Sequence, residues 1–183
     1  MLMTEEEIIK GCQIGKEKCQ KLLYDQHSKL VMGIALRFAK NENDAHDIFQ
    51  DAFLKVFLYI NNFKFLGSFE GWVRKIAVTT AISWYRKQVA DRKNGLEVEL
   101  VEDYPEVTID DEIDISLDDM LNMVKELPDG YRMVFNLFAI DGYKHEEIAA
   151  MLNISEGTSR SQFFKAKHVL QKKIVEKYKI NLI

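Results

Sequence analysis

Hydrophobic positions recur at helical spacing along most of the chain, and most regularly between residues 45 and 60. There, apolar residues return every three or four positions with polar residues between them, which predicts one amphipathic helix with a buried face. The buried face consists of Ala45, Ile48, Phe49, Ala52, Phe53, Val56, Phe57 and Ile60. Asn43 or Asp44 is placed to cap the start of this helix.

The segments before residue 45 also have helical patterns. Residues 5–24 predict one or two short helices, with an interruption near Gly11 to Gly15. A longer helix is expected after them, ending near Lys40. Its inward residues are Leu30, Val31, Ile34, Ala35 and Phe38.

A loop is predicted at residues 61–68, which read NNFKFLGS, because a glycine and four polar residues interrupt the apolar pattern. Ser68 is a suitable N-cap for the next helix, expected over about 69–89. The buried residues of that helix are Phe69, Trp72, Val73, Ile76, Ala77 and Trp84. About four packed helices therefore form a first domain, residues 1–90.

The C-terminal part predicts a second helical domain. One helix is expected around 117–127, and Pro128-Asp129 begins another that carries Val134, Phe135, Leu137 and Phe138. Asp141-Gly142 ends that helix. With two prolines, nine glycines and few β-branched runs, the whole chain is expected to be all-α, as two small helical domains.

Two short helices joined by a tight turn are predicted within residues 142–170, a helix-turn-helix arrangement. Ala149 is small enough for a second helix to cross it, and Asn153 tolerates the left-handed backbone of a sharp turn. Ser155 is a natural N-cap for the second helix. Residues 160–179 carry seven Lys and Arg side chains and one acid, Glu176, as a phosphate-facing helix requires. A surface helix pair with a solvated basic face is the alternative interpretation.

The net charge of −4 is unevenly distributed along the chain. Residues 1–90 and 120–183 each carry +3, whereas residues 91–119 carry −10. High charge and few aromatics favour a flexible acidic linker, residues 91–116, between domains 1–90 and 117–183. An inert tether would have the same composition.

Other chemistry is weakly indicated. Cys12 and Cys19 are seven positions apart, which favours small core residues over a metal or disulfide pair. His46 lies among Asp44, Asp47 and Asp51, but on a helix it points away from the face that Asp47 and Asp51 share. We therefore expect no metal, no cofactor and no enzyme active site.

No apolar run approaches the roughly 18–20 residues of a membrane span, so membrane insertion is not expected. The start of the chain, MLMTEEEIIK, is acidic and amphipathic and does not resemble a secretory signal. The expected location is the cytoplasm.

Aromatic and cationic residues alternate in the loop and helix over 63–87. Rings can stack on the bases of a single strand while cations hold its backbone. Since residues 69, 72 and 76 have helical core spacing, the binding role is reserved for Phe63, Phe65 and the polar face of the helix.

Three segments together resemble an extracytoplasmic-function (ECF) sigma factor. They are DIFQDAFLKVF (47–57), GSFEGWVRKIAVTTAISWYRK (67–87), and the segment 127–171 that contains the helix-turn-helix. The resemblance runs over roughly 20–90 and 115–175, in the order and spacing of the family. It implies that residues 1–90 are the region-2 domain and residues 117–183 the region-4 domain.

The resemblance also implies partners and site residues. The partners are core RNA polymerase, through its β′ clamp helices and β flap, promoter DNA and an anti-sigma factor. Contacts with the clamp helices would come from Asp47, Gln50, Asp51 and Lys55. The minus-ten element would be melted and bound by Asn62, Phe63, Lys64, Phe65, Ser68, Arg74, Thr79, Thr80, Ser83, Arg86 and Lys87. The minus-thirty-five element would be read in the major groove by Ser155, Thr158, Arg160, Ser161, Gln162 and Lys165.

Several residues depart from the family pattern. Thr79 and Ser83 stand where Asn and Asp are usual, and Asn153 replaces a turn glycine. Ser159 replaces an apolar residue beneath the recognition helix, and Gln162 replaces a frequent Arg, so the target sequence cannot be transferred from relatives.

The competing interpretation is a helix-turn-helix regulator that binds duplex DNA without polymerase. Such a protein has no need of the aromatic and cationic loop before Trp72. Binding to core polymerase distinguishes the two.

Overall fold

The computed structural model describes residues 3–91 and 115–178, and all of their regular secondary structure is helical. The chain divides into two compact units, Met1–Tyr85 and Arg86–Ile183. The predicted all-α class with two helical parts is confirmed. The predicted acidic linker lies outside the described residues, apart from its two ends.

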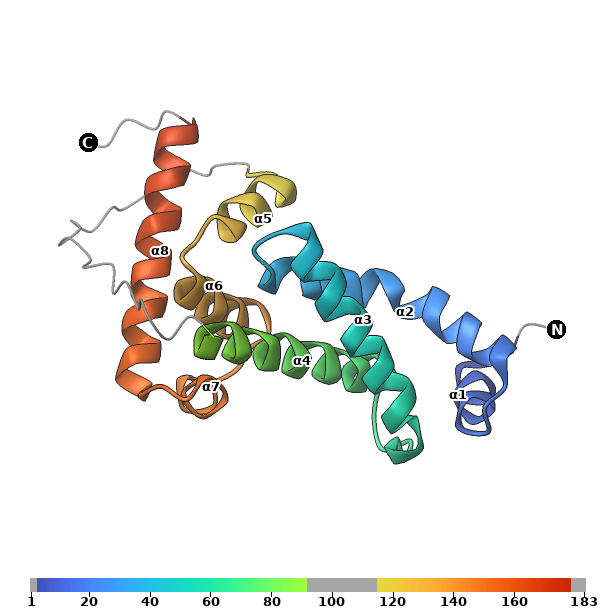
Figure 1. Ribbon diagram of the computed structural model, residues 1–183. Helices are drawn as coiled ribbons and strands as arrows, with labels where there is room; N and C mark the ends of the chain where they lie inside the picture. Colours follow the sequence, from blue (N-terminus) through green and yellow to red (C-terminus); the bar gives the residue numbers. More distant parts are fainter. Residues whose placement is uncertain (1–2, 92–114, 179–183) are drawn as a thin grey trace. The chain divides into compact units, whose positions relative to one another are not determined.

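The N-terminal unit is built from four α-helices and a short 3₁₀ turn among the described residues (Figure 1). They are α1 (Glu5–Gln13), α2 (Glu17–Phe38), α3 (Glu42–Tyr59), η1 (Ile60–Asn62) and α4 (Phe69–Asp91), which continues past the end of the unit.

Two predicted boundaries in this unit are wrong. The predicted interruption near Gly11 to Gly15 is confirmed, since α1 ends at Gln13 and Gly15 has φ of +75°. The longer helix expected after residue 24 begins instead at Glu17, and α2 is continuous to Phe38. The N-cap of α3 is Asn41 and not Asn43 or Asp44. Its side-chain oxygen accepts from the Asp44 backbone N–H at 2.9 Å, so an earlier residue already satisfies that donor.

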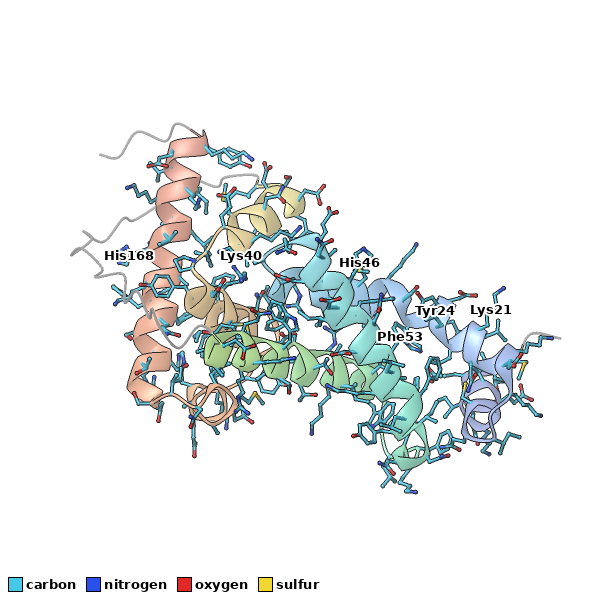
Figure 2. The ribbon with its side chains drawn as sticks, in the orientation of Figure 1. Lys21, Tyr24, Lys40, His46, Phe53 and His168 are labelled. Carbon is cyan, nitrogen blue, oxygen red and sulfur yellow. The ribbon has the colours of Figure 1, made fainter. Side chains whose placement is uncertain are left out.

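The core of the N-terminal unit lies mainly between α2 and α3. The predicted inward residues of α3 are all buried except Phe57, which is half-buried. Figure 2 shows Tyr24 of α2 beside Phe53 of α3, with ring centroids 4.7 Å apart. Cys12 and Cys19 are buried free thiols, as predicted, and burial raises the pKa of Cys12 to about 11.

Contacts of single side chains attach α4 to the rest of this unit. The ring of His27 in α2 meets Phe69 edge-on at 5.3 Å. The Lys55 ammonium of α3 donates to Thr80 Oγ1 of α4 at 3.2 Å. Burial lowers the pKa of His27, against the opposing effect of Glu5 and Glu70.

The C-terminal unit is organised along one long helix, α8 (Glu156–Tyr178), against which the shorter helices pack (Figure 1). The shorter elements are α5 (Leu117–Lys125), α6 (Asp129–Phe135), the π-helical segment η2 (Asn136–Ile140) and α7 (His145–Leu152). A core cluster consists of Met123, Val124, Leu127, Ala166, Leu170 and Ile174.

Polar side chains join α5 to its neighbours at two places, through Arg132 of α6 and through the last residues of α8. The buried guanidinium of Arg132 donates to the carbonyls of Lys125 and Leu127 at 3.2 and 2.9 Å and pairs with Asp129 at 2.7 Å. Carbonyls at the end of α5 therefore keep a donor. At the far end of α8, hydrogen bonds from Lys177 and Tyr178 lower the pKa of Asp119.

Candidate nucleic-acid interfaces

Phe63, predicted as an exposed stacking platform in the 61–68 loop, is instead only 7% exposed. Its ring centroid lies 5.0 Å from that of Phe69 and 5.7 Å from that of Trp72. The prediction of exposure is wrong because an aromatic placed just before α4 gains more by packing on the first turn of that helix.

Phe65 and Leu66 form the exposed apolar tip of the loop. Phe65 is 40% exposed and has a left-handed backbone, with φ of +59°. This conformation is disfavoured for a bulky residue by about 1–2 kcal/mol. Phe65 also meets Phe63 edge-on at 5.1 Å, so its partly exposed ring is supported by a buried aromatic side chain.

The loop is closed by local hydrogen bonds. Ser68 Oγ accepts from the Gly71 N–H at 3.2 Å and so caps α4, as predicted. Lys64 Nζ donates to the Asn61 carbonyl at 3.1 Å. Asn62, Lys64 and Ser68 are exposed, as a single-strand contact requires.

One face of α4 presents polar residues, but Thr80 is not among them. Thr80 is 2% exposed, so its expected contact with the non-template strand is wrong; it faces α3 and accepts from Lys55. Thr79 and Ser83 are exposed, and both hydroxyls donate to carbonyls of the preceding helical turn. Helical spacing puts Lys75 and Arg86 on the same face, so Lys75, one of the cations that alternate with aromatics over 63–87, joins the polar face of the helix.

The two other predicted cations of α4 are exposed but lie beside this face. Arg74 is 3.6 Å from Glu70, one turn earlier. Lys87 lies at the opposite flank and is exposed.

The outer face of α3 contains a mixed strip, defined here as Asp47, Gln50, Asp51, Leu54 and Leu58. All five are exposed and follow helical spacing. Leu54 and Leu58, each more than two-thirds exposed, were not predicted, because they are apolar and the residues expected on this face were polar. Lys55 was predicted here, but its ammonium is directed to Thr80 of α4.

The helix-turn-helix has the predicted turn chemistry. Asn153 adopts φ of 56° and ψ of 48°, the left-handed conformation expected of it. Ser155 Oγ accepts from the Thr158 N–H at 3.0 Å, which confirms it as the N-cap of α8. Ala149 is buried at the helix crossing.

Ser159, which departs from an apolar pattern, is fully buried and has a polar partner. Its Oγ lies 2.9 Å from Nδ1 of His145, the first residue of α7. The imidazole stacks on Phe138 with ring centroids 4.3 Å apart. Burial lowers the pKa of His145, and Arg160 lowers it further, so the neutral ring is favoured. A hydrogen bond thus replaces an apolar contact between α7 and α8.

The exposed side of the first turns of α8 carries Arg160, Ser161 and Phe164. Arg160 forms an ion pair with Glu156 at 2.5 Å. Phe164 is 51% exposed and was missed, although its spacing of four and three residues from Arg160 and Ser161 could have revealed it.

The remaining predicted contacts of α8 are less accessible. Thr158, Gln162 and Lys165 are half-buried. The Gln162 amide lies against Gly130 of α6, where an added Cβ would be 3.1 Å from Nε2. Helical spacing puts the three residues at the flank of the exposed face, and Gln162 lies on the side of α6.

Across 3–91 and 115–178, no helix is long and apolar enough to cross a membrane. Within the same ranges, no group of three or more His, Cys, Asp and Glu residues is arranged to hold a metal ion.

Comparison with known proteins gives two family matches. Residues 23–90 match the model for sigma-70 region 2, and residues 117–168 match the model for sigma-70, region 4. The ECF RNA polymerase sigma-E factor of Haemophilus influenzae is 26% identical over 182 residues, covering 94% of this chain and 96% of the relative. The sigma-E factor of Escherichia coli K12 is also 26% identical, covering 94% and 95%.

Solved structures similar to the chain include two complexes. One is the sigma factor RpoE with the anti-sigma factor NepR from Bartonella quintana, at 20% identity and a TM-score of 0.49, covering 83% of this chain and 94% of that one. The other is CnrH with the cytosolic domain of CnrY, at 21% identity and a TM-score of 0.48, covering 91% and 94%. From its two family matches and its curated relatives, the chain belongs to the extracytoplasmic-function sigma factors, the non-enzymatic bacterial proteins that direct RNA polymerase to initiate transcription.

Proposed function

We propose that the two helical domains of this chain bind one promoter at two separate elements while both domains are bound to core RNA polymerase. Residues 1–90 act as the region-2 domain, residues 91–116 as an acidic linker, and residues 117–183 as the region-4 domain. The observation that carries this proposal is the presence, in one chain, of an exposed aromatic loop tip and a basic helix-turn-helix. Neither feature alone separates an initiation factor from a repressor.

Docking on the β′ clamp helices is assigned to the mixed strip of α3. Asp47, Gln50 and Asp51 offer charge and hydrogen bonds at its N-terminal end, and Leu54 and Leu58 offer apolar area at the other. Such a combination suits a protein interface, since apolar side chains supply burial while the polar ones set the orientation. Lys55 is left out of this interface, because its ammonium is used within the unit.

Capture of an unpaired base of the minus-ten element is assigned to the loop tip. Extruding a base from a duplex costs a few kcal/mol, which stacking on an aromatic ring offsets by about 1–3 kcal/mol. Phe65 is 40% exposed and can offer its ring for this purpose, and Asn62, Lys64 and Ser68 are exposed polar residues of the same loop. The strand would then follow Lys75, Thr79, Ser83 and Arg86 along α4, with Arg74 and Lys87 at the flanks.

Recognition of the minus-thirty-five element is assigned to the first turns of α8. Arg160 and Ser161 reach base edges by hydrogen bonds, and Phe164 offers an apolar contact to a thymine methyl group. Ser155 and Thr158 lie at the helix N-terminus, which favours phosphate. Gln162 and Lys165 contact DNA from the flank.

This role does not require a cofactor, a metal or a catalytic group, and it takes place in the cytoplasm, where the polymerase is. We infer that an anti-sigma factor and the β flap of the polymerase are further partners.

The linker is proposed to enter the RNA exit path of the polymerase. Replacing residues 97–114 by a neutral Gly/Ser sequence should then change abortive synthesis or open-complex stability.

The deciding experiment is transcription with purified core polymerase. Promoter fragments retained by the reconstituted holoenzyme are sequenced from a random genomic library and used as templates. We expect core binding and specific initiation. A chain that binds duplex DNA alone but neither binds core nor supports initiation is a conventional regulator.

A further inference from the structure

The last residue of α1, Gln13, is hydrogen-bonded to the segment that leads into the 61–68 loop. Its Nε2 donates to the Ile60 carbonyl at 3.0 Å and to the Phe63 carbonyl at 3.3 Å, in a partly buried setting. These two carbonyls bracket Asn61 and Asn62. One side chain from 47 residues earlier therefore fixes both sides of the turn.

The Phe63 carbonyl is the first after the 3₁₀ turn, whose own closing bond runs from the Phe63 N–H to the Ile60 carbonyl at 3.1 Å. A carbonyl at the end of a helical turn needs a donor from elsewhere. An amide with two N–H groups satisfies two such acceptors at once. Gln13 thereby selects the direction in which the chain leaves the turn.

A second contact from α1 reaches the loop tip. Lys10 Nζ lies 5.8 Å from the centroid of the Phe65 ring, a cation–π distance, while also pairing with Glu6 at 2.6 Å. Lys10 and Gln13 are three positions apart and so lie on the same side of α1. Both the entry and the tip of the loop are thus contacted from a helix that precedes the family match at residues 23–90.

We propose that α1 is a working part of the minus-ten recognition unit, with Gln13 as a positioning residue for the base-capturing loop. Gln13 holds the turn so that the strained backbone of Phe65 presents its ring outward, and Lys10 supports that ring. This inference rests on the proposed function of the loop. It adds that promoter opening depends on a residue that itself contacts no DNA.

The test compares two variants of Gln13, one isosteric and one that keeps a donor, in full-length chains assembled with core polymerase. Gln13→Glu keeps the shape but replaces both N–H donors by an anionic oxygen facing two carbonyls. Gln13→Lys keeps a donor on a flexible stem. Gln26→Glu, at an exposed position of α2, is the matched control for the change of charge.

Three quantities are measured for each variant: affinity for core polymerase, thermal midpoint, and permanganate reactivity of unpaired thymines in open complexes at a promoter selected by the wild-type holoenzyme. For Gln13→Glu we expect open complex to fall by about tenfold or more, with unchanged core affinity and a chain folded at the assay temperature. Gln13→Lys should recover most of the opening, and Gln26→Glu should match the wild type.

Opening by Gln13→Glu within about twofold of the wild type would overturn the inference, and so would losses of core affinity and opening in equal proportion. Failure of the proposed function is a separate result, because there the wild-type chain itself opens no promoter.

Discussion

The ammonium of Lys55 and the hydroxyl of Thr80 join α3 to α4 through a hydrogen bond of 3.2 Å. Both residues had been expected at binding surfaces, Lys55 towards polymerase and Thr80 towards the non-template strand. Their contact directs one side chain into the other helix and buries the second. The hydrogen bond therefore stabilises the position of α4 against α3, and α4 is the helix proposed to bind the single DNA strand.

Thr80→Val should destabilise the N-terminal unit by about 1–2 kcal/mol, because the near-isosteric change leaves a partly buried ammonium without this acceptor. Urea unfolding followed by fluorescence of Trp72 and Trp84, both in α4, measures the change.

Lys55→Met should lower core-polymerase affinity far less than Asp51→Ala does. An equal loss of affinity in the two variants would show that Lys55 contributes to the polymerase interface.

Gly11→Ala should destabilise the same unit, by about 1–3 kcal/mol, because an added Cβ would lie 2.2 Å from the Cys19 sulfur. Gly33 in α2 is the matched control, since nothing lies within 4 Å of its Cβ position. There, Ala should stabilise the helix by about 0.5–1 kcal/mol. Thermal or urea unfolding of both variants gives opposite signs if the packing at Gly11 is as described.

Phe164→Ala should weaken binding to the minus-thirty-five element by about tenfold, while leaving core binding intact. If the ring contacts a thymine methyl group, replacing that thymine by uracil in the selected promoter should have a similar effect on the wild type and none on the variant. Ile140→Ala, another exposed apolar residue of this unit, is the control. If the variant and the wild type lose equal affinity on the uracil substitution, Phe164 does not contact the thymine methyl group.

Ser159→Ala should cost about 1–3 kcal/mol, because it leaves Nδ1 of the buried His145 without its partner. Adding His145→Phe, which keeps a ring against Phe138, should recover most of the loss, since removing both polar partners is nearly neutral. A double-mutant cycle by urea unfolding measures the coupling. Additive losses would show that the hydrogen bond contributes little.

The stability of the N-terminal unit should fall as pH is lowered through the histidine range. The pKa of His27 is lower in the folded chain than in the unfolded one, so below about 6.5 the unfolded state binds the proton first. Its contribution is complete above that value and is lost as pH falls through the folded pKa. Unfolding followed by Trp fluorescence should show a smaller difference between pH of about 7.5 and 5.5 for His27→Leu. An identical difference would assign the effect to other groups.

Helical periodicity was sufficient to predict the fold, because burial of an amphipathic face is a property of spacing alone. It placed the core of α3 correctly, and residue preferences for turns and caps placed Asn153 and Ser155. It could not predict that Phe63 packs on Phe69, because a loop has no period that assigns its side chains to one face. Nor could it predict the Lys55–Thr80 and His145–Ser159 pairs, which depend on how two separate helices meet.

The 61–68 loop is anchored at both ends, by the packing of Phe63 and by the Ser68 cap, and Lys64 to Gly67 lie between these two anchors. These four residues can consequently be substituted without changing the two anchors. Substituting another sequence between the two anchors should redirect the protein to different promoters without refolding the domain that carries them. If the loop reads the minus-ten element as proposed, we expect new promoter specificity from changes in these four positions, with the surrounding helices unchanged.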